Sequence, residues 1–190
     1  SDVTVVTTEI AEDPSRYGVI QTDGDRVTEY AYKPESPKGQ VIATEVLVFR
    51  VPALRAACDA LVGDGSDGAE LGDYGETILP HMVENATVHA YRSGGYWRDV
   101  GTVDAYFQAH MELIDGTGFN LYDSEWPILS NLSTSTPARI RPEAKVDNSL
   151  ICPGADVAGE VTHSLIGPGV RVERGATVNP VSYTHLTLPT

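Results

Sequence analysis

The alternation of apolar and polar residues predicts several strands in the first part of the chain. Residues 3–8 are all β-branched, which is typical of a buried parallel strand. Residues 19–22 and 26–31 alternate on either side of the turn signal Asp23-Gly24, and this arrangement predicts a β-hairpin. Residues 40–49 form the next apolar run and predict a further strand.

Three later segments have apolar residues at helical spacing. The first begins at Pro52, a residue favoured in the first turn of a helix, and the second covers residues 73–85. The third covers residues 102–114 and follows a short strand expected at residues 87–91. The positions that this third helix is expected to bury are Val103, Tyr106, Phe107, His110 or Met111, and Leu113. Strands and helices mixed in this order indicate an α/β fold.

The pattern changes after residue 115. Residues 116–148 are rich in Gly, Asn, Ser, Thr and Pro and are expected to connect two domains. Within residues 149–180 the sequence Ser-Leu-Ile-Cys-Pro-Gly returns fifteen residues later as Ser-Leu-Ile-Gly-Pro-Gly. Ile166, Val172 and Val178 recur at every sixth position, which is a signature of a parallel β-helix, although hairpins could produce a similar spacing.

The last ten residues, 181–190, break this six-residue period. Their sequence resembles a translated frame of a transposon adapter used to prepare sequencing libraries. We therefore expect them to be foreign to the natural protein. The predicted organisation is residues 1–115, a connection over 116–148, a truncated repeat over 149–180 and a tail over 181–190.

Composition narrows the possible partners. The formal net charge is −14, so binding of nucleic acid or anionic membranes through a general basic surface is not expected. Cys58 and Cys152 have neither metal-binding nor redox spacing, and this favours a reduced, cytoplasmic setting. The sequence has no apolar run of membrane-spanning length.

Residues 95–102, Gly-Tyr-Trp-Arg-Asp-Val-Gly-Thr, are the most distinctive stretch of the chain. Thr102 can cap the following helix, which places Asp99 at the end of an extended segment, where α/β proteins gather ligands. A carboxylate there could hold Mg²⁺, which prefers oxygen ligands. For a single acid, an aspartate that stabilises a local turn is the simpler interpretation.

A second candidate, Lys33, lies in a Tyr-Lys-Pro segment that two prolines keep out of any helix. Its ammonium group could serve as a point charge for a phosphate. The alternative is a solvated loop lysine, which is the commonest environment of this residue type.

The Tyr-Trp-Arg-Asp-Val-Gly-Thr string closely resembles a segment of bacterial ADP-glucose pyrophosphorylases, and the resemblance runs from about residue 3 to residue 178. It implies the C-terminal half of a Rossmann-like nucleotidyltransferase domain followed by the start of a left-handed parallel β-helix. It also implies that Asp99 is one of two aspartates that hold the catalytic Mg²⁺. By the same resemblance Gly18 contacts glucose 1-phosphate, Lys33 grips its phosphate, and Thr44 takes the place of a sugar-contacting serine.

The chain departs from the pattern of this family in two places. Tyr32 stands where a glutamate usually reads sugar hydroxyls, and Glu45-Val46 stand where a Met-Gly pair is usual. Glu45 could replace the lost acid, or the sugar could differ. The family's Gly-rich nucleotide loop, its first catalytic arginine and lysine, and its other metal aspartate are absent from these residues.

The resemblance implies an enzyme that makes ADP-glucose and pyrophosphate from ATP and glucose 1-phosphate, with Mg²⁺ as cofactor, in a homo-oligomer that is a tetramer in the family. The fragment alone is expected to be inactive. The alternatives are a related enzyme for another sugar 1-phosphate or nucleotide, and a non-catalytic regulatory subunit. An acyltransferase of the hexapeptide type is a weaker alternative, because His163 is the only histidine of the repeat and has no evident partner in the sequence.

Overall fold

The computed structural model describes residues 1–63, 71–129 and 136–183. The chain forms two compact units, Ser1–Trp97 and Arg98–Thr190, and each is described by itself. The expected foreign tail, residues 181–190, falls partly on residues 184–190, which lie outside the described residues. No helix in the described part of the chain is both long and apolar enough to cross a membrane.

Five strands of the first unit close into a small barrel in the order β1-β4-β2-β3-β5. Their bounds are β1 Val3–Glu9, β2 Gly18–Asp23, β3 Arg26–Tyr32, β4 Val41–Phe49 and β5 Val88–Arg92. A short 3₁₀ helix, η1 (Pro14–Arg16), joins β1 to β2. The expected hairpin is present, because β2 and β3 pair in antiparallel fashion around Asp23.

The direction of β1 was predicted only in part. It runs parallel to β5 but antiparallel to β4, so the sheet is mixed rather than a run of parallel strands. Val3, Val5 and Thr7 are fully buried, whereas the residues between them are partly exposed. A β-branched run predicts a strand but carries no information about the direction of its neighbours, and this explains the difference.

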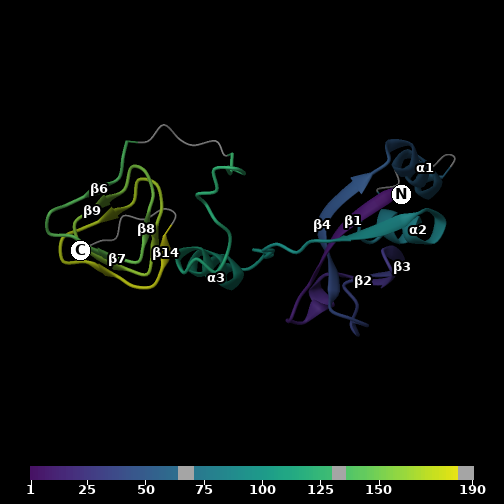
Figure 1. Ribbon diagram of the computed structural model, residues 1–190, viewed down its shortest axis with the longest axis horizontal. Coiled ribbons are helices and arrows are strands. Elements are labelled where there is room, and N and C mark those ends of the chain that lie inside the picture. Colours follow the sequence, from purple (N-terminus) through teal and green to yellow (C-terminus); the bar gives the residue numbers. More distant parts are fainter. Residues whose placement is uncertain (64–70, 130–135, 184–190) are drawn as a thin grey trace. The chain divides into compact units, whose positions relative to one another are not determined.

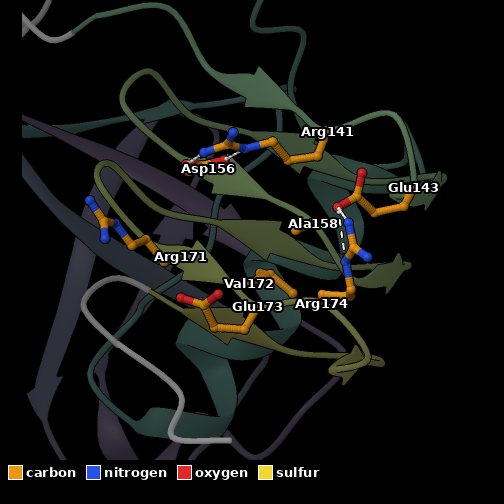
Figure 2. A pocket seen from close by; sticks show the side chains of 8 residues that line it. All are labelled: Arg141, Glu143, Asp156, Ala158, Arg171, Val172, Glu173 and Arg174. Carbon is orange, nitrogen blue, oxygen red and sulfur yellow. Dashed lines mark hydrogen bonds and ion pairs between the residues drawn. The ribbon is translucent and has the colours of Figure 1, made fainter.

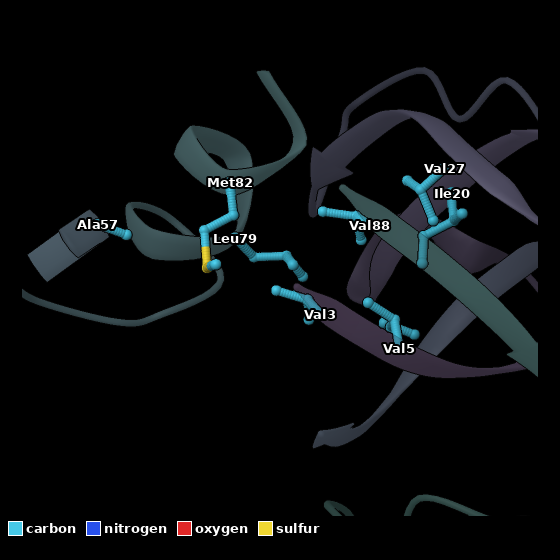
Figure 3. Packing of buried hydrophobic residues seen from close by; sticks show 9 residues of the cluster. Val3, Val5, Ile20, Val27, Ala57, Leu79, Met82 and Val88 are labelled. Atoms are coloured by element: carbon cyan, nitrogen blue, oxygen red, sulfur yellow. The ribbon is translucent and has the colours of Figure 1, made fainter. Parts of the chain in front are cut away.

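Two helices cover the core of the first unit, and they lie next to each other in Figure 1. These are α1 (Val51–Val62) and α2 (Ile78–Asn85). Figure 3 shows how Ala57 of α1 and Leu79 and Met82 of α2 approach the apolar side chains of the strands. The strand residues in this core are Val3, Val5, Ile20, Val27, Ala43 and Val88.

Helix α2 begins five residues later than the sequence predicted. Residues 74–77 form turns, in which the Asp73 carbonyl accepts hydrogen bonds from the amides of Glu76 and Thr77. Pro80 lacks an amide hydrogen, and its ring would clash with the carbonyl four residues earlier in a longer helix. The helix therefore starts just before Pro80, where a proline is tolerated.

The second unit contains α3 (Val103–Ile114) and nine short strands arranged in three parallel sheets. The sheets are β13-β10-β7, β14-β11-β8 and β12-β9-β6. The strand bounds are β6 Arg139–Ile140, β7 Lys145–Asp147, β8 Leu150–Ile151, β9 Asp156–Val157, β10 Glu160–Thr162, β11 Leu165–Ile166, β12 Arg171–Val172, β13 Thr177–Val178 and β14 Ser182–Tyr183. We refer to these strands and their connections as the coil stack, whose turns are visible in Figure 1.

Register shows how the chain winds in the coil stack. Leu165 pairs in parallel with Leu150, fifteen positions earlier, and with Ser182, seventeen positions later. The residues at six-residue spacing, Ile166, Val172 and Val178, are all buried. Parallel pairing agrees with the interpretation of coils and not with hairpins. The stack already begins at β6, within the segment that the sequence assigned to the connection.

Helix α3 differs from its prediction. None of its residues is fully buried, and Val103, expected in the core, is 84% exposed. Apolar residues at helical spacing predict the helix itself, but a solvent-facing apolar stripe has the same spacing as a buried one.

Candidate functional site

Lys33 stands at the end of the β2–β3 hairpin, directly beside Gly18. Its backbone amide donates to the Tyr17 carbonyl at 3.0 Å, and Tyr32 is the register partner of Gly18. Lys33 has φ +42°, a left-handed conformation that is unusual for a residue with a side chain. The hairpin therefore brings together three of the residues that the sequence analysis selected.

A carboxylate that the sequence analysis did not select joins this group. The Tyr32 hydroxyl donates to Asp73 Oδ2 at 2.9 Å, and the Gly75 amide donates to Asp73 Oδ1 at 2.8 Å. The Gly75 amide, with the Tyr32 hydroxyl, holds the pKa of Asp73 below its usual value. Asp73 lies in the turn before α2, and the sequence analysis placed it only at the start of the helix expected over residues 73–85.

The charge on Lys33 is stabilised by these neighbours. Its ammonium nitrogen lies 4.6 Å from the centre of the Tyr32 ring. Hydrogen bonding with Tyr32 raises the pKa of Lys33, and the nearby carboxylates of Asp73 and Glu45 raise it further. The side chain remains accessible to solvent, so it presents a permanent positive charge to a ligand. We call Gly18, Tyr32, Lys33, Glu45 and Asp73 the lysine site.

Glycine is required at two positions around the lysine site. A Cβ atom on Gly18 would lie 2.5 Å from the Tyr30 ring, and one on Gly75 would lie 2.7 Å from the Tyr32 ring. Both distances are too short for any side chain. The absence of a Cβ atom at Gly18 and Gly75 therefore allows the rings of Tyr30 and Tyr32 to pack directly against the backbone.

Thr44 and Glu45 lie in an irregular part of β4. Val5 pairs with Leu47 and Thr7 pairs with Ala43, so three residues of β4 face the single residue Val6. Thr44 is only 7% exposed, and its hydroxyl donates to the Val6 carbonyl at 3.0 Å. This bond stabilises the bulge.

Glu45 itself is exposed and has φ +64°, the left-handed region that favours glycine. The family resemblance described above aligns Glu45-Val46 with a Met-Gly pair and therefore Val46 with the family's glycine. Of these two described residues of the bulge, Glu45 has this left-handed conformation and Val46 does not. A glycine would therefore fit the backbone best at position 45.

Asp99 lies in the second unit and forms a local turn. Its Oδ1 accepts a hydrogen bond from the Gly101 amide at 3.0 Å. Thr102 caps α3 as predicted, because its hydroxyl accepts from the Ala105 amide at 3.1 Å. Arg98 binds Glu112 on α3 and does not form an ion pair with Asp99 among the described residues. The Asp99 carboxylate is exposed, and among the described residues no hydrogen bond to its second oxygen is found.

The fit of this carboxylate to Mg²⁺ can be judged from its surroundings. In the described ranges, no three His, Cys, Asp or Glu side chains gather as a ready-made metal cage. Mg²⁺ is usually held by one or two carboxylates together with waters and substrate phosphates. A single exposed carboxylate oxygen on a hydrogen-bonded turn fits that requirement as one ligand.

Two further contacts concern residues named in the sequence analysis. Trp97, which precedes Asp99 by two residues, packs edge-on against Tyr17 with ring centres 5.7 Å apart.

His163, which had no evident partner in the sequence, has its Nε2 atom 2.8 Å from Asp115 Oδ1. The partner of His163 was not predictable because Asp115 is 48 positions away.

Comparison with known proteins supports one family. The family model described as "Nucleotidyl transferase" matches residues 1–116. A glucose-1-phosphate adenylyltransferase of Thermotoga neapolitana is 36% identical over 183 residues, which cover 94% of the chain and 43% of that protein. Proteins of the same name from Lachnospira eligens and Clostridium acetobutylicum are 37% and 32% identical and are covered over 41% and 47% of their length. The chain thus spans less than half the length of these relatives, and the match over residues 1–116 shows that it belongs to the nucleotidyl transferase family.

Proposed function

We propose that the chain is the sugar-phosphate-binding part of an enzyme that joins glucose 1-phosphate to ATP and releases ADP-glucose and pyrophosphate. The observation that carries this proposal is the lysine site. A charged, accessible lysine is surrounded there by hydrogen-bonding groups suited to a sugar, in a chain similar to proteins named glucose-1-phosphate adenylyltransferase.

Each group of the lysine site has a distinct chemical role in this proposal. The Lys33 ammonium binds the phosphate of the sugar and compensates its charge. The carboxylates of Asp73 and Glu45 accept hydrogen bonds from sugar hydroxyls, as does the oxygen of Tyr32. Gly18 lets the Tyr30 ring pack against the backbone beside Lys33, and its own backbone lies next to the ammonium-bearing residue. Thr44, whose hydroxyl is bound to Val6, contributes through the shape of the bulge and through its remaining acceptor capacity.

Asp99 is proposed as a ligand of Mg²⁺ and therefore as the catalytic carboxylate of this chain. The ion would neutralise charge on the reacting phosphates when bound. The turn closed by the Gly101 amide orients the Asp99 carboxylate before any metal is present, which lowers the cost of ordering it. The groups that bind ATP, and a second carboxylate for the metal, would come from residues outside this sequence.

The coil stack completes the proposal. We infer that it is the start of a left-handed parallel β-helix built from hexapeptide repeats, and that it takes part in a homo-oligomer, a tetramer in the family. Stacked coils bury their core against neighbouring coils, which makes such a domain a suitable place for subunit contacts. The expected setting is cytoplasmic.

Binding of the sugar phosphate by this chain can be tested without the nucleotide. A ¹⁵N-labelled 190-residue chain is titrated with glucose 1-phosphate, inorganic phosphate and glucose, and amide shifts are followed by NMR. We expect saturable shifts at Gly18, Lys33 and Gly75, with glucose 1-phosphate binding more tightly than phosphate or glucose alone. Equal affinities for phosphate and glucose 1-phosphate, or shifts confined to other residues, would contradict the proposal.

A further inference from the structure

Two residues of α3 bind all three guanidinium nitrogens of Arg98. The Nε atom donates to Glu112 Oε2 at 3.0 Å, Nη2 donates to Glu112 Oε1, and Nη1 donates to Gln108 Oε1 at 3.2 Å. Gln108 and Glu112 are four positions apart and therefore lie on one face of the helix. The side chains of Arg98 and Glu112 are only 22% and 29% exposed, so salt screens this pair less than a fully exposed one. We call Arg98, Gln108 and Glu112 the arginine clamp.

The arginine clamp requires the segment before α3 to turn back along the helix. Glu112 follows the capping residue Thr102 by ten positions, which corresponds to roughly 15 Å along the helix axis. An extended segment ahead of the helix would carry Arg98 roughly 13 Å farther from Glu112, and the two side chains could not span that distance. Residues 98–102 are therefore fixed at both ends, by the clamp at Arg98 and by the cap at Thr102.

Asp99 lies between these two fixed points. Its Oδ1 accepts a hydrogen bond from the Gly101 amide at 3.0 Å. A Cβ atom on Gly101 would lie 3.2 Å from both carboxylate oxygens, so the glycine leaves the space that the carboxylate occupies in this orientation. A single hydrogen bond on an exposed turn contributes little by itself. The orientation of the carboxylate therefore depends on how firmly the flanking residues are held.

We propose that Arg98 is a positioning residue, which ties the segment carrying Asp99 to α3 and keeps the Asp99 carboxylate in one orientation for a metal ion. This inference rests on the proposed function, in which Asp99 is a ligand of Mg²⁺. A carboxylate that is oriented in advance loses less conformational freedom when the metal binds. The other role open to Arg98 is direct contact with a substrate phosphate, but the phosphate would have to displace its bonds to Glu112 and Gln108.

The first measurement is the χ1 conformation of Asp99 in the ¹⁵N,¹³C-labelled 190-residue chain, obtained from three-bond NMR couplings to Cγ. We expect a single rotamer in the parent chain. Arg98→Met and Glu112→Gln should each give a side chain averaged over several rotamers, and Arg98→Lys, which keeps the charge but not the planar fork, should give an intermediate result. A role of Arg98 in helix stability alone would lower the melting temperature without releasing the Asp99 side chain.

Arg141→Met is the matched control, because Arg141 also binds both oxygens of one carboxylate, that of Asp156 (Figure 2). The side chains of this pair are 35% and 27% exposed, which is similar to the exposure of Arg98 and Glu112. The control removes a two-pronged ion pair from the same compact unit, changes the net charge equally and leaves the arginine clamp intact. The Asp99 rotamer should therefore be unchanged.

The second measurement uses Mn²⁺ as a probe of the metal, because its unpaired electrons broaden the NMR signals of nearby amides. In the parent chain Mn²⁺ should broaden the Gly101 signal, and Asp99→Asn should remove this effect. Arg98→Met should raise the Mn²⁺ concentration that halves the Gly101 signal by about two- to ten-fold, since the carboxylate must then be ordered on binding. Arg141→Met should leave that concentration unchanged.

The two measurements separate this inference from the proposed function. Averaging of the Asp99 rotamer in Arg98→Met, but not in Arg141→Met, would support the positioning role. If Mn²⁺ did not affect Gly101 in that case, only the metal assignment of Asp99 would be contradicted. The positioning role would be overturned by an Asp99 rotamer that stays single in both Arg98→Met and Glu112→Gln, that is already averaged in the parent chain, or that Arg141→Met releases equally.

Discussion

The Tyr32 hydroxyl donates a hydrogen bond to the Asp73 carboxylate at 2.9 Å, across 41 positions of sequence. This contact places an acid beside Lys33 even though Tyr32 itself replaces a glutamate of the resembling family. Glu45 adds a second acid near the same ammonium group. The lysine site therefore contains two carboxylate acceptors although Tyr32 stands in place of that glutamate, and in the proposed function they receive the sugar hydroxyls.

The phosphate contact of Lys33 is the first prediction. Lys33→Gln should weaken binding of glucose 1-phosphate to the chain by roughly ten- to a hundred-fold, because a charge-assisted bond is worth on the order of 1.5–3 kcal/mol. Isothermal titration measures the affinity. Lys38→Gln is the matched control, since Lys38 is exposed and pairs with Glu29. An affinity that is equally reduced in both variants, or in neither, would make Lys33 an ordinary surface lysine.

A second prediction concerns the backbone at Glu45. Glu45→Gly should raise the free energy of unfolding by about 0.5–1 kcal/mol, because the strain of a left-handed residue exceeds the extra flexibility of glycine in the unfolded chain. The same variant should weaken binding of glucose 1-phosphate, since it removes a carboxylate from the lysine site. Denaturant unfolding and titration on one preparation measure both effects.

The control for Glu45 is Asn148→Gly, at another left-handed position in the coil stack. It should change stability without changing the affinity for the sugar phosphate. If Glu45→Gly stabilises the chain and leaves the affinity intact, Glu45 has only a structural part in the bulge.

A third prediction separates catalysis from folding at Asp99. In a fusion of this chain to the nucleotide-binding half of the Thermotoga neapolitana relative, Asp99→Asn should lower kcat by orders of magnitude, because a metal ligand acts on the transition state. Asparagine can still accept the hydrogen bond from the Gly101 amide, so the turn and the melting temperature should change little. Turnover is measured with Mg²⁺ titrated.

The matched control for Asp99 is Asp104→Asn, in the first turn of α3. It should affect helix stability by about 0.3–1 kcal/mol and leave turnover near that of the parent fusion. Near-normal turnover of the Asp99→Asn fusion at ordinary Mg²⁺ concentrations would contradict the metal assignment.

The fourth prediction is a pH dependence in the coil stack. The pKa of Asp156 is held below its usual 3.8 by the hydrogen bond from Arg141. A depressed folded-state pKa stabilises the folded protein above the unfolded value, and this contribution is lost as the pH falls through the folded-state pKa. Asp156→Asn should therefore lower the melting temperature at neutral pH, and the difference from the parent chain should shrink once the pH drops below about 4.

Thermal unfolding followed at several pH values measures this difference. Glu160→Gln is a useful comparison, because its ion pair with Lys145 is long, at 3.9 Å, and exposed. It should lower the melting temperature much less at every pH. A deficit in Asp156→Asn that persists unchanged in strong acid would show that the loss comes from packing and not from the ion pair.

Local patterns in the sequence predicted the elements of the fold well. The hairpin around Asp23, the helix that begins near Pro52 and the cap of α3 by Thr102 were all expected from residues within a few positions of one another. Gly18 and Lys33 were expected at one site only through the family resemblance, and the hairpin brings them next to each other. The turn at Asp99 was the simpler of two sequence interpretations, and the Gly101 contact confirms that it forms.

By itself, the sequence determined most of the strands, helices, turns and coils, because periodicity and capping depend on near neighbours along the chain, although α2 begins later and the coil stack earlier than predicted. Only the tertiary structure decided the mixed direction of the sheet, the contact of Tyr32 with Asp73 and the pairing of Arg141 with Asp156. These features depend on which distant segments lie side by side. Charge and hydrogen-bonding capacity act through space, so their effect on a site follows from the folded arrangement rather than from spacing along the chain.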